Sequence, residues 1–455
     1  MKAGSIHWVF ALGLVCLPTV SHAQATLAGR LTTTATNEQF NVGSQDPSIS
    51  PDGRYVAFVS TSNNIGQPSN GTLNVYRYDL GTDAYLLATE VLGVGNSNAP
   101  SISEGGIALA FESQADDLAS GTPSGQADVF YSEAFDAGGG AVAFHTYLVS
   151  KGLLGAAPDS ASQNASVSGN GLYVAFLSYA SNLIEGDTNA APDIFVADSA
   201  NLFAGQPERV SVNNGGAQIN GYSRALSPSA ISSDGRLVAF AVDTPVSIDG
   251  SNPGIGGDVF VRDRTLGTTS LISKSTAGVA ATSSSDEVAI SPNGRYVVFR
   301  SFATNLVTSP SGSRIYVRDR QNDTTTNMPL PLGAHNCEDP RVSDVGSIVA
   351  QCNMPFPFSP QAFFYDPTGD GAFYLLSTSL TDTNGNGTSG DFTGISADGR
   401  FMVFDSAASD LVPDDTNSAP DVFAAVPEPD AASGWLIAVA ALVVVARQRG
   451  KRRSR

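Results

Sequence analysis

The chain contains little histidine, tryptophan, cysteine or basic charge. It has 4 histidines, 2 tryptophans, 3 cysteines and 24 lysines and arginines, against 43 aspartates and glutamates. The net charge of −19 excludes nucleic-acid binding through a basic surface, because such binding needs lysine and arginine facing the phosphates. The sequence also has no His-Glu-x-x-His helix and no Gly-x-Ser-x-Gly elbow, which excludes two common kinds of hydrolase site.

Long apolar runs are equally rare, and the first lies at the N-terminus. Ile6–Val20 is mainly apolar, follows Lys2, and precedes Ser21-His22-Ala23, where small residues occupy the two positions that signal peptidase reads. This pattern predicts a secretory signal peptide over residues 1–23. The alternative, a buried first helix, is disfavoured because the apolar run is short. We therefore expect export across the inner membrane by the Sec and signal peptidase machinery.

One motif recurs seven times between the two ends. It reads SISPDGRYVAF up to Phe58, and later copies end at Phe111, Phe176, Phe240, Phe299, Gln351 and Phe404. Each copy predicts a short strand such as Pro47–Ser50, a two-residue turn such as Asp52-Gly53, and a second strand. The second strand, Tyr55–Ser60 in the first copy, is apolar on both faces, so neighbouring units must cover both of its sides.

A third and a fourth strand follow each hairpin. The third is clearest where it starts with aspartate, at Asp128, Asp193, Asp258 and Asp421, and the fourth is clearest at Thr268–Ser273. Four antiparallel strands in each repeat of 52 to 65 residues indicate a β-propeller.

The seventh repeat supplies only three strands before the chain changes character. Gly29–Thr34 resembles the fourth strand at Glu208–Val212, so the N-terminal strand is expected to complete the last blade and remove the exposed sheet edges. The sequence thus predicts an all-β protein, a single seven-bladed β-propeller over residues 24–425. An open solenoid is the alternative, but solenoids need caps.

The succession of SPDGRYVAF and DVFVRDR resembles the repeats of TolB-type, WD40-like β-propellers of exported bacterial proteins. The resemblance spans about Gly29–Ala425 and implies the fold rather than an activity. TolB itself carries an additional N-terminal α/β domain for which we expect no room here, so its envelope partners are not carried over.

The C-terminal segment, residues 426–455, combines three features in a fixed order. Pro427, Glu428 and Pro429 come first, then the apolar stretch Trp435–Ala446, then six basic residues. This order resembles the PEP-CTERM sorting signal of Gram-negative bacteria. The resemblance implies a transient hydrophobic transmembrane helix in the inner membrane, recognition by an exosortase, and release or attachment at the cell surface, often beside exopolysaccharide. A permanent C-terminal anchor is the alternative, although the apolar stretch is shorter than a spanning helix needs.

Two cysteines remain beyond the signal peptide, Cys337 and Cys352. An even pair in an exported protein is typical of a disulfide, with free buried thiols as the alternative. The sixth hairpin is expected to turn around Asp344–Gly346, which puts the two cysteines almost opposite each other. A nucleophilic Cys337 beside His335 is disfavoured because no third group orients the pair. We therefore predict no catalytic residue.

Two matching loops carry the pattern most typical of a metal site. EGDTNAAPD contains Asp187, Asn189 and Asp193, and PDDTNSAPD contains Asp415, Asn417 and Asp421. Oxygen ligands at alternating positions suit Ca²⁺, so both loops are candidate calcium sites. The alternative is a pair of Asx-type turns that fix the loop between the second and third strands.

These features favour a non-catalytic, exported propeller that binds or scaffolds a protein or an exopolysaccharide. The expected binding rim carries the fourth-to-first and second-to-third connections, which include the long loops Glu90–Ala99 and Asn213–Leu226. A propeller-based polysaccharide hydrolase or lyase is one alternative, and two carboxylates converging in one pocket would favour it. A central channel lined by backbone, serine and threonine would disfavour it. A purely structural matrix component is the other alternative.

Overall fold

The computed structural model describes residues 25–427 except for residues 35, 90, 120–124, 202, 204, 220, 222, 225–226, 244–255, 309–313, 356–358 and 369–370. The predicted signal peptide lies outside the described residues, and so do Glu428, Pro429 and the rest of the predicted sorting tail. In the described part of the chain, no helix is long and apolar enough to cross a membrane.

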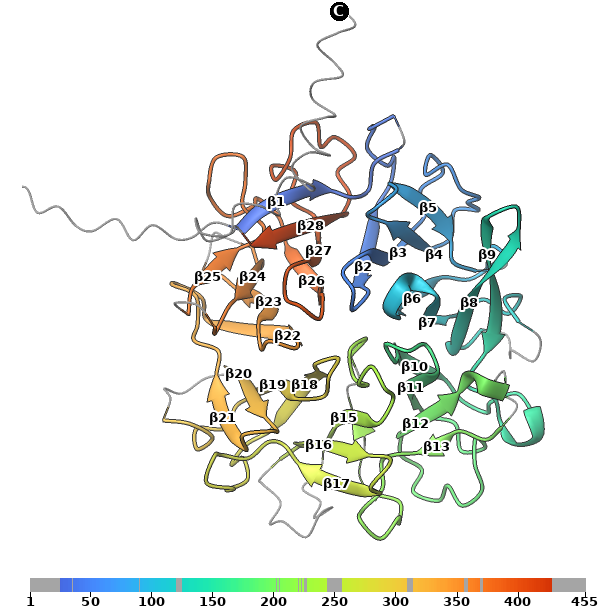
Figure 1. Ribbon diagram of the computed structural model, residues 1–455, viewed down its shortest axis with the longest axis vertical. Helices are drawn as coiled ribbons and strands as arrows, with labels where there is room; N and C mark the ends of the chain where they lie inside the picture. Colours follow the sequence, from blue (N-terminus) through green and yellow to red (C-terminus); the bar gives the residue numbers. More distant parts are fainter. Residues whose placement is uncertain are drawn as a thin grey trace, which may run out of the picture.

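Seven four-stranded antiparallel sheets are arranged in a ring (Figure 1). Six of them consist of four consecutive strands, and the first strand of each lies nearest the centre of the ring (Figure 1). The predicted seven-bladed propeller with four antiparallel strands per blade is therefore confirmed.

The blades are numbered here in sequence order. Blade 1 contains β2 (Ser44–Ile49), β3 (Tyr55–Ser60), β4 (Asn74–Asp79) and β5 (Ala84–Leu87). Blade 2 contains β6 (Ser97–Ile102), β7 (Ala108–Ser113), β8 (Asp128–Gly138) and β9 (Ala141–Leu148). Blade 3 contains β10 (Ser162–Val167), β11 (Tyr173–Ser178), β12 (Asp193–Asp198) and β13 (Glu208–Arg209). Blade 4 contains β14 (Ser223–Arg224), β15 (Leu237–Val242), β16 (Asp258–Asp263) and β17 (Thr268–Leu271).

The remaining blades follow the same order. Blade 5 contains β18 (Ser285–Ile290), β19 (Tyr296–Ser301), β20 (Arg314–Asp319) and β21 (Thr324–Asn327). Blade 6 contains β22 (Asn336–Val342), β23 (Ile348–Asn353), β24 (Gln361–Tyr365) and β25 (Phe373–Leu375). Blade 7 contains β26 (Ser389–Ile395), β27 (Met402–Ser406), β28 (Asp421–Pro427) and β1 (Ala25–Arg30). Three short 3-10 helices, η1 (Glu104–Gly106), η2 (Leu153–Gly155) and η3 (Ser199–Asn201), lie in connections.

Blade 7 joins the two ends of the described chain. Strand β1 pairs antiparallel with β28, from Ala25 opposite Pro427 to Arg30 opposite Phe423. The expected closure by an N-terminal strand is confirmed, but the predicted strand, Gly29–Thr34, begins four residues too late. Thr33 instead pairs with Gln39 across a turn. Strand β28 also extends two residues beyond the expected end of the propeller, so Pro427 belongs to the last blade.

The core lies between the blades, as the two-sided apolar strands predict. Ala57 and Val75 of blade 1 pack in one cluster with Phe111 and Phe130 of blade 2, and all four side chains are fully buried. Burial of this kind contributes about 1.5 to 3 kcal/mol for each large side chain. The interfaces between neighbouring blades therefore hold the ring together.

The repeated glycine of the motif allows a side chain of the preceding blade to pack closely against the turn. Gly235 has φ +75, and a Cβ built on it would lie 2.0 Å from the ring of Tyr173 in the preceding blade. The predicted two-residue turn is wrong, however. Ser50 N donates to Tyr55 O, and Gly53 N donates to Ser50 O, so four residues connect the strands and the glycine is the only one of the four with positive φ.

A cross-strand pair recurs at the far end of the first hairpin. Five blades join two buried serine hydroxyls by a hydrogen bond: Ser44–Ser60, Ser97–Ser113, Ser162–Ser178, Ser285–Ser301 and Ser389–Ser406. In blade 6 the same register position holds Cys337 opposite Cys352, linked by a disulfide with 4.0 Å between the Cα atoms. The disulfide is thus the covalent counterpart of a repeated polar pair.

Candidate functional site

One face of the ring carries the second-to-third and fourth-to-first connections, and we call it the loop rim. Asn side chains fasten these two kinds of loop to each other. Asn182 Oδ1 accepts from Asp159 N at 3.1 Å, and its Nδ2 donates to Ala157 O at 2.9 Å. Asn64 and Asn305 make the same pair of bonds in blades 1 and 5. In blades 1, 3 and 5 these bonds hold the described loop residues in place on a rigid scaffold, which suits a binding surface.

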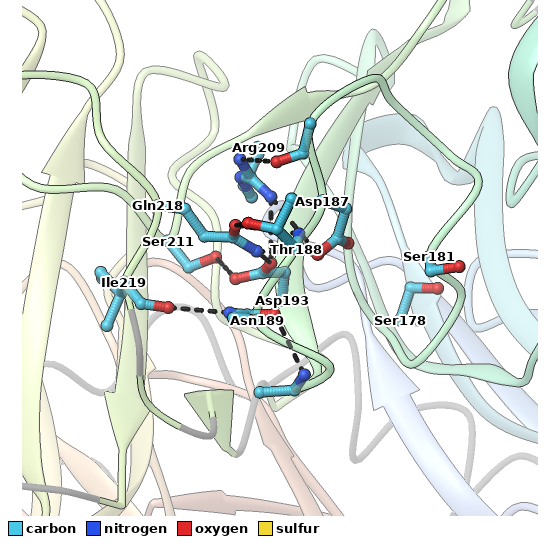
Figure 2. A network of polar contacts seen from close by, with 12 residues as sticks. Ser178, Ser181, Asp187, Thr188, Asn189, Asp193, Arg209, Ser211, Gln218 and Ile219 are labelled. Carbon is cyan, nitrogen blue, oxygen red and sulfur yellow. Dashed lines mark hydrogen bonds and ion pairs between the residues drawn. The ribbon is translucent and has the colours of Figure 1, made fainter.

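The first candidate calcium loop contains a network of polar side chains (Figure 2). Arg209 Nη1 lies 3.6 Å from an Asp187 carboxylate oxygen and 3.3 Å from one of Asp193. Gln218 Nε2 donates to the same two carboxylates at 2.7 and 2.8 Å (Figure 2). Gln218 Oε1 accepts from Thr188 N, and this bond fixes which end of the amide faces the acids.

The second candidate loop repeats the same arrangement across the closure of the ring. Arg30 Nη1 lies 3.9 Å from Asp415 and 3.4 Å from Asp421. Gln39 Nε2 donates to both carboxylates at 2.8 and 2.7 Å, and Gln39 Oε1 accepts from Thr416 N. Arg30 and Gln39 come from the N-terminal segment, so this network ties the first strand to the last.

These residues do not fit a calcium ion. In each loop the two carboxylates already face a guanidinium and an amide NH₂ group, which take the position that a cation would need. The asparagines face elsewhere: Asn189 Oδ1 accepts from Ala191 N, and its Nδ2 donates to Ile219 O; Asn417 bonds Ala419 N and Phe40 O in the same way. Calcium takes six to eight oxygens. In the described part of the chain, no group of three His, Cys, Asp or Glu side chains could hold a metal.

Acidic residues also gather on the loop rim at the mouth of the central channel. There the innermost strands carry a β-bulge, seen as a register shift in β2, β18 and β22. The bulges hold Asp46, Glu287 and Asp339 at positive φ. A bulge at this position leaves one residue outside the ladder and re-aims its side chain. The bulges thereby bring acidic residues from different blades to one mouth.

Arginine balances the acids on one side of the mouth. Arg300 lies 2.9 Å from Asp286, 2.5 Å from Glu287 and 3.1 Å from Glu338. Burial nonetheless raises the pKa of Glu287 to about 7. Arg341 is buried nearby and donates to Pro340 O; burial lowers its pKa.

The other side of the mouth contains four acids from blades 7, 1 and 2: Asp46, Glu112, Asp391 and Asp405. We call this set the acidic half-mouth. Backbone amides support three of them, since Ala99 N donates to Asp46, Asn164 N to Glu112 and Phe392 N to Asp405. Gln351 donates to Asp391 at 2.6 Å. Burial, with repulsion between these carboxylates, raises the pKa of Asp46 to about 6 and that of Asp405 to about 7.

The channel below the mouth is nearly filled. Pro228 O accepts from Ser101 Oγ at 2.8 Å and from Ser166 Oγ at 3.0 Å, so blade 4 inserts a segment that bonds blades 2 and 3. A cavity of about 20 Å³ remains beside Asp46 and Arg341, which is room for a water molecule or two. An adjoining cavity of about 50 Å³ has no charged residue in its lining. Asp46 is thus the one carboxylate that lines either of these two cavities.

The sequence predictions did not include the acidic half-mouth. A partial signal was present, because a polar pair that includes an acid recurs near the start of the first strand in several repeats, as in Gln45-Asp46, Asp286-Glu287 and Glu338-Asp339. Of the long loops that were predicted to bind, Glu90 and part of Asn213–Leu226 lie outside the described residues, whereas Val91 and Val94 are exposed on the loop rim.

No protein-family model matches the chain, and no curated protein matches it. Among solved structures, an oligogalacturonate lyase in complex with manganese has a TM-score of 0.51 at 13% identity over 90% of this chain and 94% of that one. TolB from Acinetobacter baumannii has a TM-score of 0.36 at 18% identity, covering 66% of this chain and 57% of TolB. The propeller domain of a Trilobed protease from Pyrococcus furiosus has a TM-score of 0.48 at 9% identity, covering 81% and 92%.

The likeness to the lyase, at 13% identity, shows the fold alone. This chain is similar to proteins named for a lyase, a protease and TolB, and it spans little more than half of the length of the Acinetobacter TolB. A shared fold does not fix an activity, so the function has to be argued from the site itself.

Proposed function

We propose that this chain is an exported, exosortase-sorted propeller of the cell surface or extracellular space that binds a protein or exopolysaccharide partner through its loop rim and channel mouth, without catalysing a reaction. The observation that carries the proposal is the combination of a fixed loop rim with a nearly filled channel. A cavity of about 20 Å³ has no room for a sugar ring, so a partner meets the protein at its surface.

The path of the last strand supports this arrangement. Strand β28 begins at Asp421 on the loop rim and ends at Pro427. Because a strand rises about 3.3 Å per residue, Pro427 lies at the opposite end of the blade. A tail that continues from Pro427 therefore leaves from the face opposite the loop rim. While the tail is held by the inner membrane or an exosortase, the binding face points away from that membrane.

The test is capture of a partner from the envelope of a host that makes exopolysaccharide. Mature protein on beads is incubated with separated protein and polysaccharide fractions, and bound material is identified by mass spectrometry or sugar analysis. We expect one fraction to be retained, and retention to fall when Val91 and Val94 on the loop rim are both replaced by glutamate. The matched control replaces Leu266, an exposed residue of the opposite rim. Retention of neither fraction would favour a purely structural matrix component.

A hydrolase or lyase is the second candidate, and one observation favours it. Two neighbouring carboxyl groups, Asp46 and Asp405, have pKa values raised to about 6 and about 7, which is the range of a general acid at neutral pH. Incubation with acidic and neutral polysaccharides separates the two functions. New reducing ends or unsaturated products that disappear in Asp405→Asn would establish the enzyme and overturn the proposed binding role.

A further inference from the structure

The acidic half-mouth has an excess of negative charge. Asp46 is repelled by Glu112 and Asp391, and Asp405 is repelled by Asp391 and Asp46. Arg341 lines the same cavity as Asp46 but donates to Pro340 O, and no lysine or arginine within the described segments forms an ion pair with any of the four acids. Arg300, in contrast, contacts three acids across the mouth. Uncompensated charges in a partly buried cluster oppose folding. The stability of the propeller therefore does not account for them.

One atom of this cluster points to a ligand. Asp46 is 4% exposed, and its Oδ2 accepts from Ala99 N at 2.9 Å. Its Oδ1 is buried with no hydrogen-bond partner among the described residues, and the residue lines the cavity beneath the mouth. A buried carboxylate oxygen without a donor costs its full desolvation free energy. A cationic donor from another molecule would satisfy it.

The approach to Asp46 selects the shape of that donor. Pro47, Pro100 and Phe392 form apolar parts of the cavity lining, and the space is small. A lysine side chain combines a slender apolar stem with a compact ammonium at its tip. An amino sugar carries its ammonium directly on a ring, and an arginine ends in a broad planar group, so both are too wide. We propose that the acidic half-mouth binds the ammonium group of a lysine side chain on a partner protein.

This inference rests on the proposed binding role of the loop rim and names the chemistry of the partner. The probe is a short blocked peptide with one central lysine, compared with the same peptide carrying norleucine, which has the stem without the charge. Binding to the mature protein is measured by calorimetry at low and high salt. We expect the lysine peptide to bind at least tenfold more tightly at low salt, with the difference shrinking as salt screens the charges.

The variants Asp46→Asn and Asp405→Asn should each reduce lysine-peptide affinity at least tenfold. The matched control is Asp398→Asn, which removes one charge from a hairpin turn on the opposite rim. Asparagine already occupies the equivalent turns at Asn170 and Asn293, so this control folds normally and should bind as the unchanged protein does. Melting curves accompany each variant, and Asp391→Asn replaces any variant that fails to fold.

Three results would overturn the inference, two with the peptides and one with an envelope partner. One is equal binding of the lysine and norleucine peptides. A second is an equal loss of affinity in Asp398→Asn, which would mean that only the total charge of the protein matters. Capture of an envelope partner that persists in Asp46→Asn would also overturn the lysine inference while leaving the proposed binding role intact. Failure of all envelope capture would count against the proposed function instead.

Discussion

The buried carboxyl group of Asp128 makes the stability of the protein depend on pH. Its Oδ1 accepts from Ser150 Oγ at 3.0 Å, whereas its Oδ2 is buried with no partner among the described residues. Burial raises its pKa from 3.8 to about 6. A carboxyl whose pKa is higher in the folded state contributes stability at low pH and loses it as pH rises through the folded pKa. Its ionised form therefore weakens the protein at neutral pH.

We expect Asp128→Asn to raise the free energy of unfolding by about 2 kcal/mol at pH 7.5 and to change it little at pH 4. Asparagine suits the position, because Asn74 starts the equivalent strand of blade 1. Thermal melts of the variant and the unchanged protein at both pH values check this. A gain of equal size at pH 4 and pH 7.5 would show that titration of Asp128 is not the cause.

The serine pairs of the other blades predict the effect of replacing the disulfide of blade 6 by two serines. Changing both Cys337 and Cys352 to serine should restore the hydrogen-bonded pair found in five other blades. We expect the fold to persist with a loss of about 3 kcal/mol, because the disulfide closes a loop of 15 residues. Non-reducing peptide mapping of exported protein should find the Cys337–Cys352 link, and two alkylatable thiols there would contradict it.

In blade 4 the same register position holds Val242, so a serine pair can be introduced there by a single substitution. It faces Ser223, whose Oγ is buried without a partner among the described residues. Val242→Ser should complete a sixth serine pair and offset the lost apolar contacts by about 1 kcal/mol. A melting temperature that falls as far as in Val298→Ser, a buried control position without a facing serine, would refute this pairing.

The two Asp-Asn loops join neighbouring strands through ion pairs between their aspartates and an arginine. Arg209→Met would leave Asp187 and Asp193, both nearly inaccessible, without their counter-charge, so we expect a loss of about 3 kcal/mol. Treatment with EDTA should leave the melting temperature unchanged. A fall on chelation that excess Ca²⁺ reverses would restore the calcium interpretation.

The sequence predicted the elements whose signals are local. The two-sided apolar second strands and the aspartate-led third strands were placed correctly, and the turns were found at the right positions although they contain four residues instead of two. The first strands were predicted too short, because the bulge at Asp46 breaks the alternation on which the prediction relied. The sequence predicts calcium ligands in the two Asp-Asn loops because the local pattern does not show the arginines that face the carboxylates. Arg209 lies on the following strand, and Arg30 is 391 residues from Asp421. The acidic half-mouth stayed hidden because only the closed ring brings blades 7, 1 and 2 together.

The distribution of tryptophan gives a test of processing for the molecule as a whole. The 2 tryptophans are Trp8 and Trp435, one in the predicted signal peptide and one in the predicted sorting tail. We expect protein recovered from the outer surface of an exosortase-bearing host to emit as tyrosine alone, because both tryptophans have been removed. Tryptophan emission from that material, together with a C-terminal peptide that contains Trp435, would identify the tail as a permanent anchor.

The pairing of β1 with β28 also sets an order in time. During synthesis the N-terminal strand emerges first, yet its partner is among the last described segments to follow, 391 residues away at the Arg30–Asp421 contact. The hairpins of blades 1 to 6 join strands that are close in sequence and can form as they emerge, whereas closure must wait for nearly the whole chain. Pairing over such a separation is slow. Until then β1 remains an open edge that another chain could occupy, so chaperones should matter most in the interval before the last blade is complete.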